Sequence, residues 1–148
     1  YLSHSSPFLR SRVLSLIAAA VPLLATSTSV AFDGSATNRQ ADLLPVIHRA
    51  WPYILNRIAD SEPYVVLEAV SLIESLATHV GSFMSRRVLD DVWPRFRTLL
   101  AKQEKLGRSS ALTGLTPYTT SHRIYRAILS TMHHVAKDVP LKEGVVWE

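Results

Sequence analysis

Two Trp-Pro pairs with similar surroundings constrain the fold more than any other feature of this sequence. Residues 46–58 contain Trp51 and Pro52, and the segment around Trp93 and Pro94 aligns with them so that apolar residues fall on apolar residues at the main contact positions. The two tryptophans stand 42 residues apart. Internal periods of about 40 to 47 residues are typical of HEAT and armadillo repeats, which are built from paired helices. The chain is therefore predicted to be an array of helical repeats.

A second internal similarity pairs the segment that starts at Pro7 with the segment that starts at Pro63, 56 residues further on. The extra length is assigned to a connection over residues 27–42, which is rich in Ser, Thr, Gly and Asn, because insertions in repeat proteins usually lengthen loops. The apolar residues 13–25 follow Arg10 and Arg12 and imitate a secretory signal, whereas as a membrane span the stretch is short and is interrupted by Pro22. Their place in the repeat favours a buried helix over both.

Apolar periodicity and helix punctuation together predict an all-α chain. Each helix has an apolar stripe and a polar back, so a helix pair buries its stripe only by stacking on neighbours. We expect a HEAT-type α-solenoid of antiparallel helix pairs. Because the chain begins at Tyr1 rather than at a methionine, residues 1–148 are interpreted as a fragment of a longer superhelix. The predicted helices cover residues 7–26, 43–59, 63–80, 84–104 and 121–137, with loops over 27–42 and 105–120 and a tail over 139–148.

The aligned Trp-Pro pairs are predicted to have structural roles. Trp51 and Trp93 fall on matching inward stripes, which favours core packing over a role as ligand platforms. Pro52 and Pro94 are expected inside their helices, where each removes one backbone hydrogen bond and introduces a bend. A bend that recurs in successive units is compatible with repeat geometry.

The ends of the third predicted helix are marked by punctuation residues. Pro63 is expected in its first turn, where the missing amide hydrogen is harmless. The polar connection before it places Asp60 or Ser61 where a side chain caps the helix. Gly81 is expected to end that helix. A tight helical hairpin is therefore predicted between the second and third helices.

The sequence contains none of the motifs that would indicate an enzyme. It has no cysteine, glycine-rich phosphate loop, Gly-x-Ser-x-Gly elbow, His-Glu-x-x-His helix or EF-hand loop. We therefore predict no catalytic residue, no cofactor and no metal site. His133 and His134, with His122 upstream, are interpreted as surface or interface histidines because no accompanying set of metal ligands is recognised. The lack of cysteines and of Asn-x-Ser/Thr acceptors favours the cytoplasm and nucleus.

The net charge of +4 is concentrated between Arg86 and Arg108. A solvated helix face with a basic loop is the preferred interpretation, and a nucleic-acid-associated adaptor that uses the basic stretch 86–108 is the alternative. Asp90 and Asp91 are predicted to form exposed ion pairs with nearby arginines rather than a catalytic pair. Trp147 either packs back on the last helix or is offered to a partner. The candidate partner contacts are Arg86, Arg87, Arg95 and Trp147.

Three segments carry a resemblance to a known family. Residues 43–58, 62–69 and 80–94 resemble the C-terminal HEAT region of the family of the first Tel-two-interacting protein, in a fungal-like form. The resemblance is clearest from Leu43 to Leu100 and extends over the flanking helices. It implies a large α-solenoid that is a subunit of the TTT co-chaperone complex.

The resemblance also implies partners and a role. It implies assembly with the Tel-two protein and a second Tel-two-interacting protein, and links to the ninety-kilodalton heat-shock chaperone and an Rvb-containing assembly. The implied clients are phosphatidylinositol-kinase-related kinases, which the complex helps to mature and stabilise. We therefore expect a non-catalytic scaffold that acts through protein–protein contacts, with no membrane as a partner.

Overall fold

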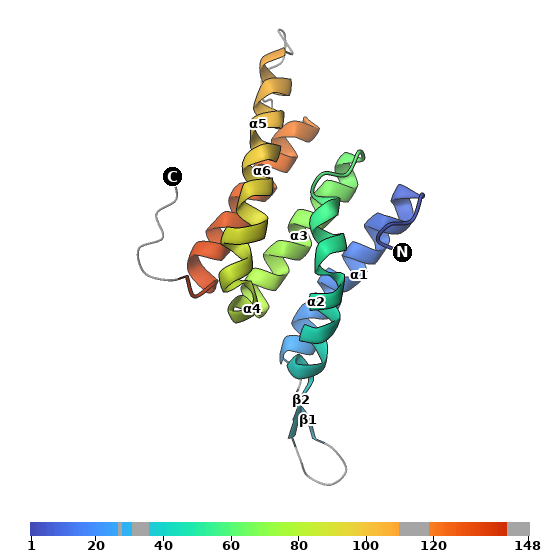
Figure 1. Ribbon diagram of the computed structural model, residues 1–148, viewed down its shortest axis with the longest axis vertical. Coiled ribbons are helices and arrows are strands. Elements are labelled where there is room, and N and C mark those ends of the chain that lie inside the picture. Colours follow the sequence, from blue (N-terminus) through green and yellow to red (C-terminus); the bar gives the residue numbers. More distant parts are fainter. Residues whose placement is uncertain (27, 31–35, 110–118, 142–148) are drawn as a thin grey trace.

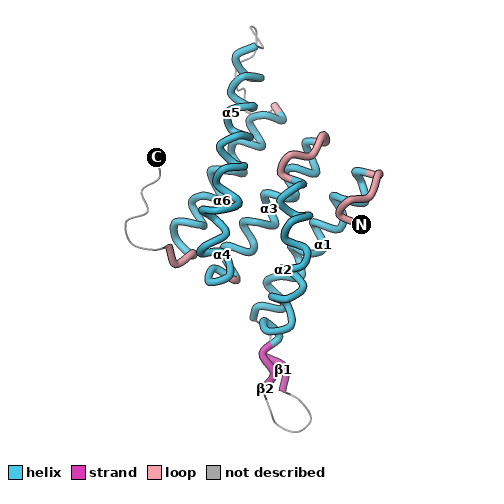
Figure 2. Tube along the Cα trace, viewed as in Figure 1, coloured by secondary structure: helices cyan, strands magenta, loops and turns pink. Residues whose placement is uncertain are grey.

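The computed structural model describes residues 1–26, 28–30, 36–109 and 119–141, and in this part the chain is almost entirely helical. Its two short strands pair antiparallel, with Ser29 opposite Thr37 (Figure 2). The prediction of an all-α helical-repeat fold is confirmed. The elements are α1 (Pro7–Thr26), β1 (Thr28–Val30), β2 (Ala36–Asn38), α2 (Arg39–Arg57), α3 (Pro63–His79), α4 (Gly81–Arg87), a π-helical turn η1 (Val88–Val92), α5 (Trp93–Ser109) and α6 (Thr120–Asp138).

The helices form two layers. In the first layer α3 lies in the middle and packs extensively on α1 and α6, while α2 and α5 lie over this layer in the second (Figure 1). The two internal sequence similarities follow the layers. The segments that begin at Pro7 and Pro63 are α1 and α3 of the first layer. Trp51 and Trp93 belong to α2 and α5 of the second.

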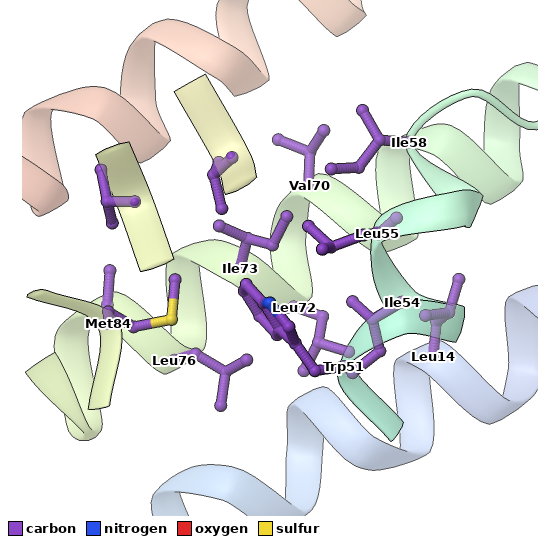
Figure 3. Close-up of a cluster of buried hydrophobic side chains, with 14 of the residues drawn as sticks. Leu14, Trp51, Ile54, Leu55, Ile58, Val70, Leu72, Ile73, Leu76 and Met84 are labelled. Atoms are coloured by element: carbon purple, nitrogen blue, oxygen red, sulfur yellow. The ribbon is translucent and has the colours of Figure 1, made fainter. Parts of the chain in front are cut away.

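The core lies between the layers, and α3 supplies its centre. Apolar residues recur in α3 on two adjoining faces, so this helix is buried along its length between α1 and α6. Trp51 and Ile54 of α2 and Met84 of α4 close over it (Figure 3). The fully buried side chains of this centre include Leu14, Ile54, Leu72, Ile73, Leu76 and Met84.

A sharp corner joins α3 to α4 without a loop. The backbone of Val80 leaves the helical region, and its N–H donates to the carbonyl oxygen of Leu76. Gly81 then starts α4 directly. A Cβ at Gly81 would collide with the main-chain carbonyl oxygen of Asp138 at the end of α6. The glycine predicted as a helix stop therefore also permits a close approach by the last helix.

Some predicted boundaries were wrong. The predicted loop over 27–42 contains the β1–β2 ladder, and α2 begins at Arg39 rather than at residue 43. The predicted helix over 84–104 begins at Gly81, changes to a π-helical turn, and continues to Ser109. The last helix ends at Asp138, and Val139 of the predicted tail is buried against the core. Residues 142–148 of that tail lie outside the described residues.

The proline in α5 is accommodated by the π-helical turn. Pro94 has no amide hydrogen, and its ring would crowd the carbonyl four residues earlier in a regular α-helix. In η1 the N–H of Trp93 bonds instead to the carbonyl of Val88, five residues earlier. The predicted irregularity at Pro94 is therefore a widened turn. Pro22 and Pro52 lie inside α1 and α2, which continue through them.

Candidate protein-interaction surfaces

The outer side of α1 carries an exposed apolar stripe. Phe8, Leu16 and Leu23 are 60%, 69% and 68% exposed, and their spacing places them on one side of the helix. The guanidinium of Arg12 lies 5.3 Å from the centre of the Phe8 ring, so it covers one end of the stripe. We call Phe8, Leu16 and Leu23 the α1 stripe.

The outer side of α6, at the other end of the first layer, is polar. Its exposed residues include Arg123, Arg126, His133 and Lys137, with Leu129 as a single large apolar side chain among them. Terminal repeats of a solenoid that face water need such a polar outer side. The two ends of the layer therefore differ: α6 is suited to solvent, whereas the α1 stripe is suited to another protein surface.

The apolar character of α1 is also compatible with a membrane span by length and composition. Among the described residues, α1 is the one single helix that is long and apolar enough to cross a membrane. α3 and the helix that follows it meet the same criteria only together, as a pair bent by 120°. Only 17% of the most apolar 18-residue stretch of α1 is buried within the fold. Its inner side nevertheless packs on α3 and α2 and contains the buried residues Arg10, Leu14 and Val21.

A groove of about 670 Å³ lies between the α2–α3 connection, α5 and the start of α6. We call it the corner groove. On α5 its lining residues share one helix face, because they recur at intervals of three and four residues. Gln103 on this face is only 5% exposed. The α5 lining consists of Pro94, Arg95, Thr98, Leu99, Lys102, Gln103 and Leu106.

A buried ion-pair network supports the wall of the corner groove at Asp60. Arg10 of α1 donates two hydrogen bonds to the Asp60 carboxylate, at 2.9 and 2.8 Å, and Arg57 donates a third at 2.9 Å. The backbone N–H of Glu62 donates to Asp60 Oδ1 at 3.1 Å. The N-cap of α3 is Glu62 and has no side-chain capping hydrogen bond, so the predicted cap by Asp60 or Ser61 was wrong. The remaining Arg10 nitrogen donates to the carbonyls of His4 and Ser5.

The network sets the ionisation of its members. Burial raises the pKa of Asp60, but the hydrogen bonds from Arg10 and Glu62 and the charges of Arg10 and Arg57 outweigh it, so that the pKa lies below its ordinary value. The hydrogen bond to Asp60 raises the pKa of Arg10. Asp60 is therefore an ionised anchor between α1 and the α2–α3 connection. Sequence reasoning missed Arg10, which resembled the charged flank of a signal segment.

Trp51 lies in the core and links the second-layer helices. Its indole N–H donates to Asp91 Oδ2 at 2.7 Å, and its ring meets the edge of Phe83 at 5.9 Å between centroids. The Arg87 guanidinium stacks 3.8 Å from the Phe83 centroid, donates to the Phe83 carbonyl and lies beside His48. Arg87, a candidate partner contact, is thus held within the fold. The prediction of an exposed ion pair for Asp91 was wrong, because its carboxylate accepts the hydrogen bond from Trp51.

The other candidate residues lie apart from one another. Arg86 is exposed and forms the predicted ion pair with Asp90 at 3.2 Å, whereas Arg95 donates to the carbonyl of Asp91 and lines the corner groove. Trp93 is only partly buried against the core, unlike Trp51. The three prolines are exposed: Pro52 lies inside α2, Pro63 begins α3, and Pro94 is in the first turn of α5. Trp147 lies outside the described residues.

His134 of α6 has acidic neighbours that sequence reasoning missed. His134 Nε2 lies 3.2 Å from Glu74 Oε1 of α3, and His134 Nδ1 lies 3.3 Å from Asp138 Oδ2 one turn further on. Glu74 also accepts a hydrogen bond from Ser130. His133 is exposed and touches the edge of His134. Among the described residues no group of three or more such side chains has a geometry suited to a metal ion, and the contacts instead join α6 to α3.

Two layers of stacked helices define an α-helical repeat protein. The family model described as "TTI1 C-terminal TPR domain" matches residues 1–148. The chain belongs to this family. Its description names tetratricopeptide repeats where the sequence pattern indicated HEAT repeats, and both classes stack antiparallel helix pairs.

Two curated relatives match the chain. TELO2-interacting protein 1 homolog of Mus musculus is 30% identical over 103 residues, and the human protein of the same name is 29% identical over 103 residues. Each match covers 69% of this chain and 9% of the relative. The chain thus corresponds to a small part of these proteins' length. No solved structure matches it.

Proposed function

We propose that this chain is a non-catalytic scaffold segment of a TTT-like co-chaperone complex and that it acts through protein–protein contacts. The observation that carries the proposal is the contrast between the apolar α1 stripe and the polar outer side of α6. Helical repeats bury such stripes against a neighbouring repeat or a companion protein. The name of the two relatives, TELO2-interacting protein 1 homolog, supports a Tel-two protein as a partner.

We further propose the finer role that the family resemblance implies. The complex includes a second Tel-two-interacting protein, works with the ninety-kilodalton heat-shock chaperone and an Rvb-containing assembly, and supports maturation and stability of phosphatidylinositol-kinase-related kinases. The cytoplasm and nucleus are the proposed locations. Membrane attachment is not part of the proposal, because the inner side of α1 packs on α3 and places Arg10 in the network with Asp60.

Co-purification tests the scaffold role. The full-length protein that contains this segment is expressed with the Tel-two protein and the second interacting protein, and recovery of each is measured. Leu16→Lys combined with Leu23→Lys is expected to reduce recovery strongly, because it charges the α1 stripe. Leu129→Lys on α6 is the matched control, since it changes an exposed leucine outside the stripe. Recovery of neither partner by the unchanged protein would contradict the proposal.

The nucleic-acid alternative makes a different prediction. Binding through the basic stretch 86–108 would weaken steeply as salt is raised. Asp90 offsets the charge of Arg86, and the Arg87 guanidinium is held against Phe83, so both arginines already have partners within the fold. Gel-shift titration of the full-length protein with single-stranded and duplex DNA at low salt tests it, and we expect no shift.

A further inference from the structure

We infer that the corner groove binds a short segment of a partner protein that carries carboxylates among bulky apolar side chains. The inference rests on the proposed scaffold function and names the chemistry of one partner segment. The groove is separate from the α1 stripe, because its lining residues belong to the α2–α3 connection, the start of α3, α5 and α6.

The size and lining of the groove suit a peptide. A volume of about 670 Å³ falls within the range of sites that enclose small ligands. Ile58, Val66 and Ile124 form buried apolar parts of the lining, and Leu106 is 48% exposed at its edge. Bulky apolar side chains would gain burial here.

The electrostatics of the groove favour a carboxylate. Arg95 and Lys102 are exposed on the groove face of α5, one above the other at a spacing of two turns. Asp60 is the acidic residue among the described residues of the lining, and both its oxygens are already bonded, to Arg10, Arg57 and the Glu62 N–H. The groove therefore presents uncompensated positive charge to an incoming segment.

Gln103 adds a polar group that can hydrogen-bond to a segment bound in the groove. The side-chain amide of glutamine has both donors and an acceptor. Gln103 is 5% exposed and is part of the groove lining. A peptide backbone offers the complementary N–H and C=O groups. This favours a protein segment over a nucleic acid, whose phosphates would match only the cations.

Site-specific photocrosslinking tests the inference in the intact protein. Thr98 lies on the groove face of α5 and is exposed, so it is replaced by the photoreactive benzoylphenylalanine in the full-length protein expressed with its complex. After irradiation the adduct is digested and its site is found by mass spectrometry. We expect a partner segment that contains Asp or Glu together with Leu, Ile, Phe or Met.

Charge-reversal variants show whether the groove selects that segment. Arg95→Glu with Lys102→Glu is expected to reduce the adduct about tenfold or more, because two attractive charges become repulsive. Arg97→Glu is the matched control, since Arg97 is exposed on α5 but does not line the groove. Gln103→Leu, which is apolar and similar in size, is expected to retain the fold and to weaken the adduct.

The outcomes separate this inference from the scaffold proposal. No protein adduct, a nucleic-acid adduct, an adduct within this chain itself, or an adduct without acidic residues would overturn the groove assignment. An acidic segment that crosslinks equally to the charge-reversed variant would also overturn it. Recovery of the Tel-two protein is measured in the same samples. If the acidic adduct forms but the Tel-two protein is not recovered, the result contradicts the proposed scaffold partners and leaves the groove assignment standing.

Discussion

Asp60 joins three parts of the chain through one carboxylate. Arg10 comes from α1, Arg57 from the last turn of α2, and the Glu62 N–H from the connection to α3. A carboxylate with its side chain 1% exposed is stable as an ion only because these donors replace water. The network thus fixes how the α2–α3 corner sits on α1, and with it the Asp60 wall of the corner groove.

Removing this charge is expected to destabilise the protein substantially. Asp60→Asn retains the shape of the side chain but leaves Arg10 and Arg57 without a counter-charge, so the free energy of unfolding should fall by about 3 kcal/mol. Asp90→Asn breaks only the exposed pair with Arg86 and should change it by less than about 1 kcal/mol. Urea unfolding followed by circular dichroism measures both, and equal effects would contradict the role assigned to the network.

The same carboxylate predicts an acid dependence of stability. Its pKa is lower in the folded protein than the ordinary value of 3.8, so the unfolded chain takes up the proton first as the pH falls. The stabilisation is complete above pH 3.8 and is lost as the pH falls through the lower folded pKa. The stability difference between the native protein and Asp60→Asn should therefore be constant near neutrality and shrink below pH 3.8. Unfolding titrations at a series of pH values test this, and a gap that widens in acid would refute it.

At the scale of elements, the α3–α4 corner and η1 show how small local features position whole helices. Gly81 lets α3 and α4 meet the end of α6 without a side chain between them. The five-residue π-helical turn η1 precedes Pro94 and allows the helix to continue through it. Both features act on α5 and α6, the two helices that border the corner groove.

Gly81→Ala is expected to destabilise the corner. Alanine favours a helix over glycine, but here its Cβ would meet the rigid carbonyl of Asp138, and such overpacking typically costs about 1–3 kcal/mol. Ser82→Ala, at the next and exposed position, keeps the corner open and serves as the control. Thermal unfolding should show a lower Tm for Gly81→Ala alone. A Tm raised by both substitutions would mean that helix propensity decides instead.

The elements were predictable where periodicity is strong. α1, α3 and α6 have long apolar stripes, and their predicted limits lie within one residue of the observed ones. The β1–β2 ladder was missed because a polar segment was interpreted only as an insertion. The β-branched residues at Thr28, Val30 and Thr37 and the Asp33-Gly34 dipeptide were the available strand and turn signals.

The interaction surfaces were less predictable than the helices. The Arg10–Asp60 bond spans 50 residues and the Trp51–Asp91 bond spans 40, so local patterns carry no sign of them. The corner groove likewise depends on how α5 lies against the α2–α3 connection. Arg95 was singled out for its charge alone, whereas Lys102 and Gln103 gained a role only from their shared helix face.

For the whole molecule, we expect the unequal ends of the first layer to govern association. The α1 stripe presents large apolar side chains to solvent, whereas the outer side of α6 presents charged ones. Residues 1–148 expressed alone should therefore self-associate through α1, and Leu16→Lys with Leu23→Lys should shift them towards monomer. Sedimentation velocity over a range of concentrations measures this. An unchanged distribution of species would place the association elsewhere.

The central position of α3 has a consequence for how the molecule opens. Because α3 is covered by α1 on one side and by α6 on the other, either outer helix can detach while α3 keeps one neighbour. Backbone amide protons of α3 should therefore exchange with deuterated solvent most slowly, with faster exchange in α1 and α6. Exchange followed by mass spectrometry would reveal that gradient, and uniform protection across the helices would mean that the molecule opens as a single cooperative unit.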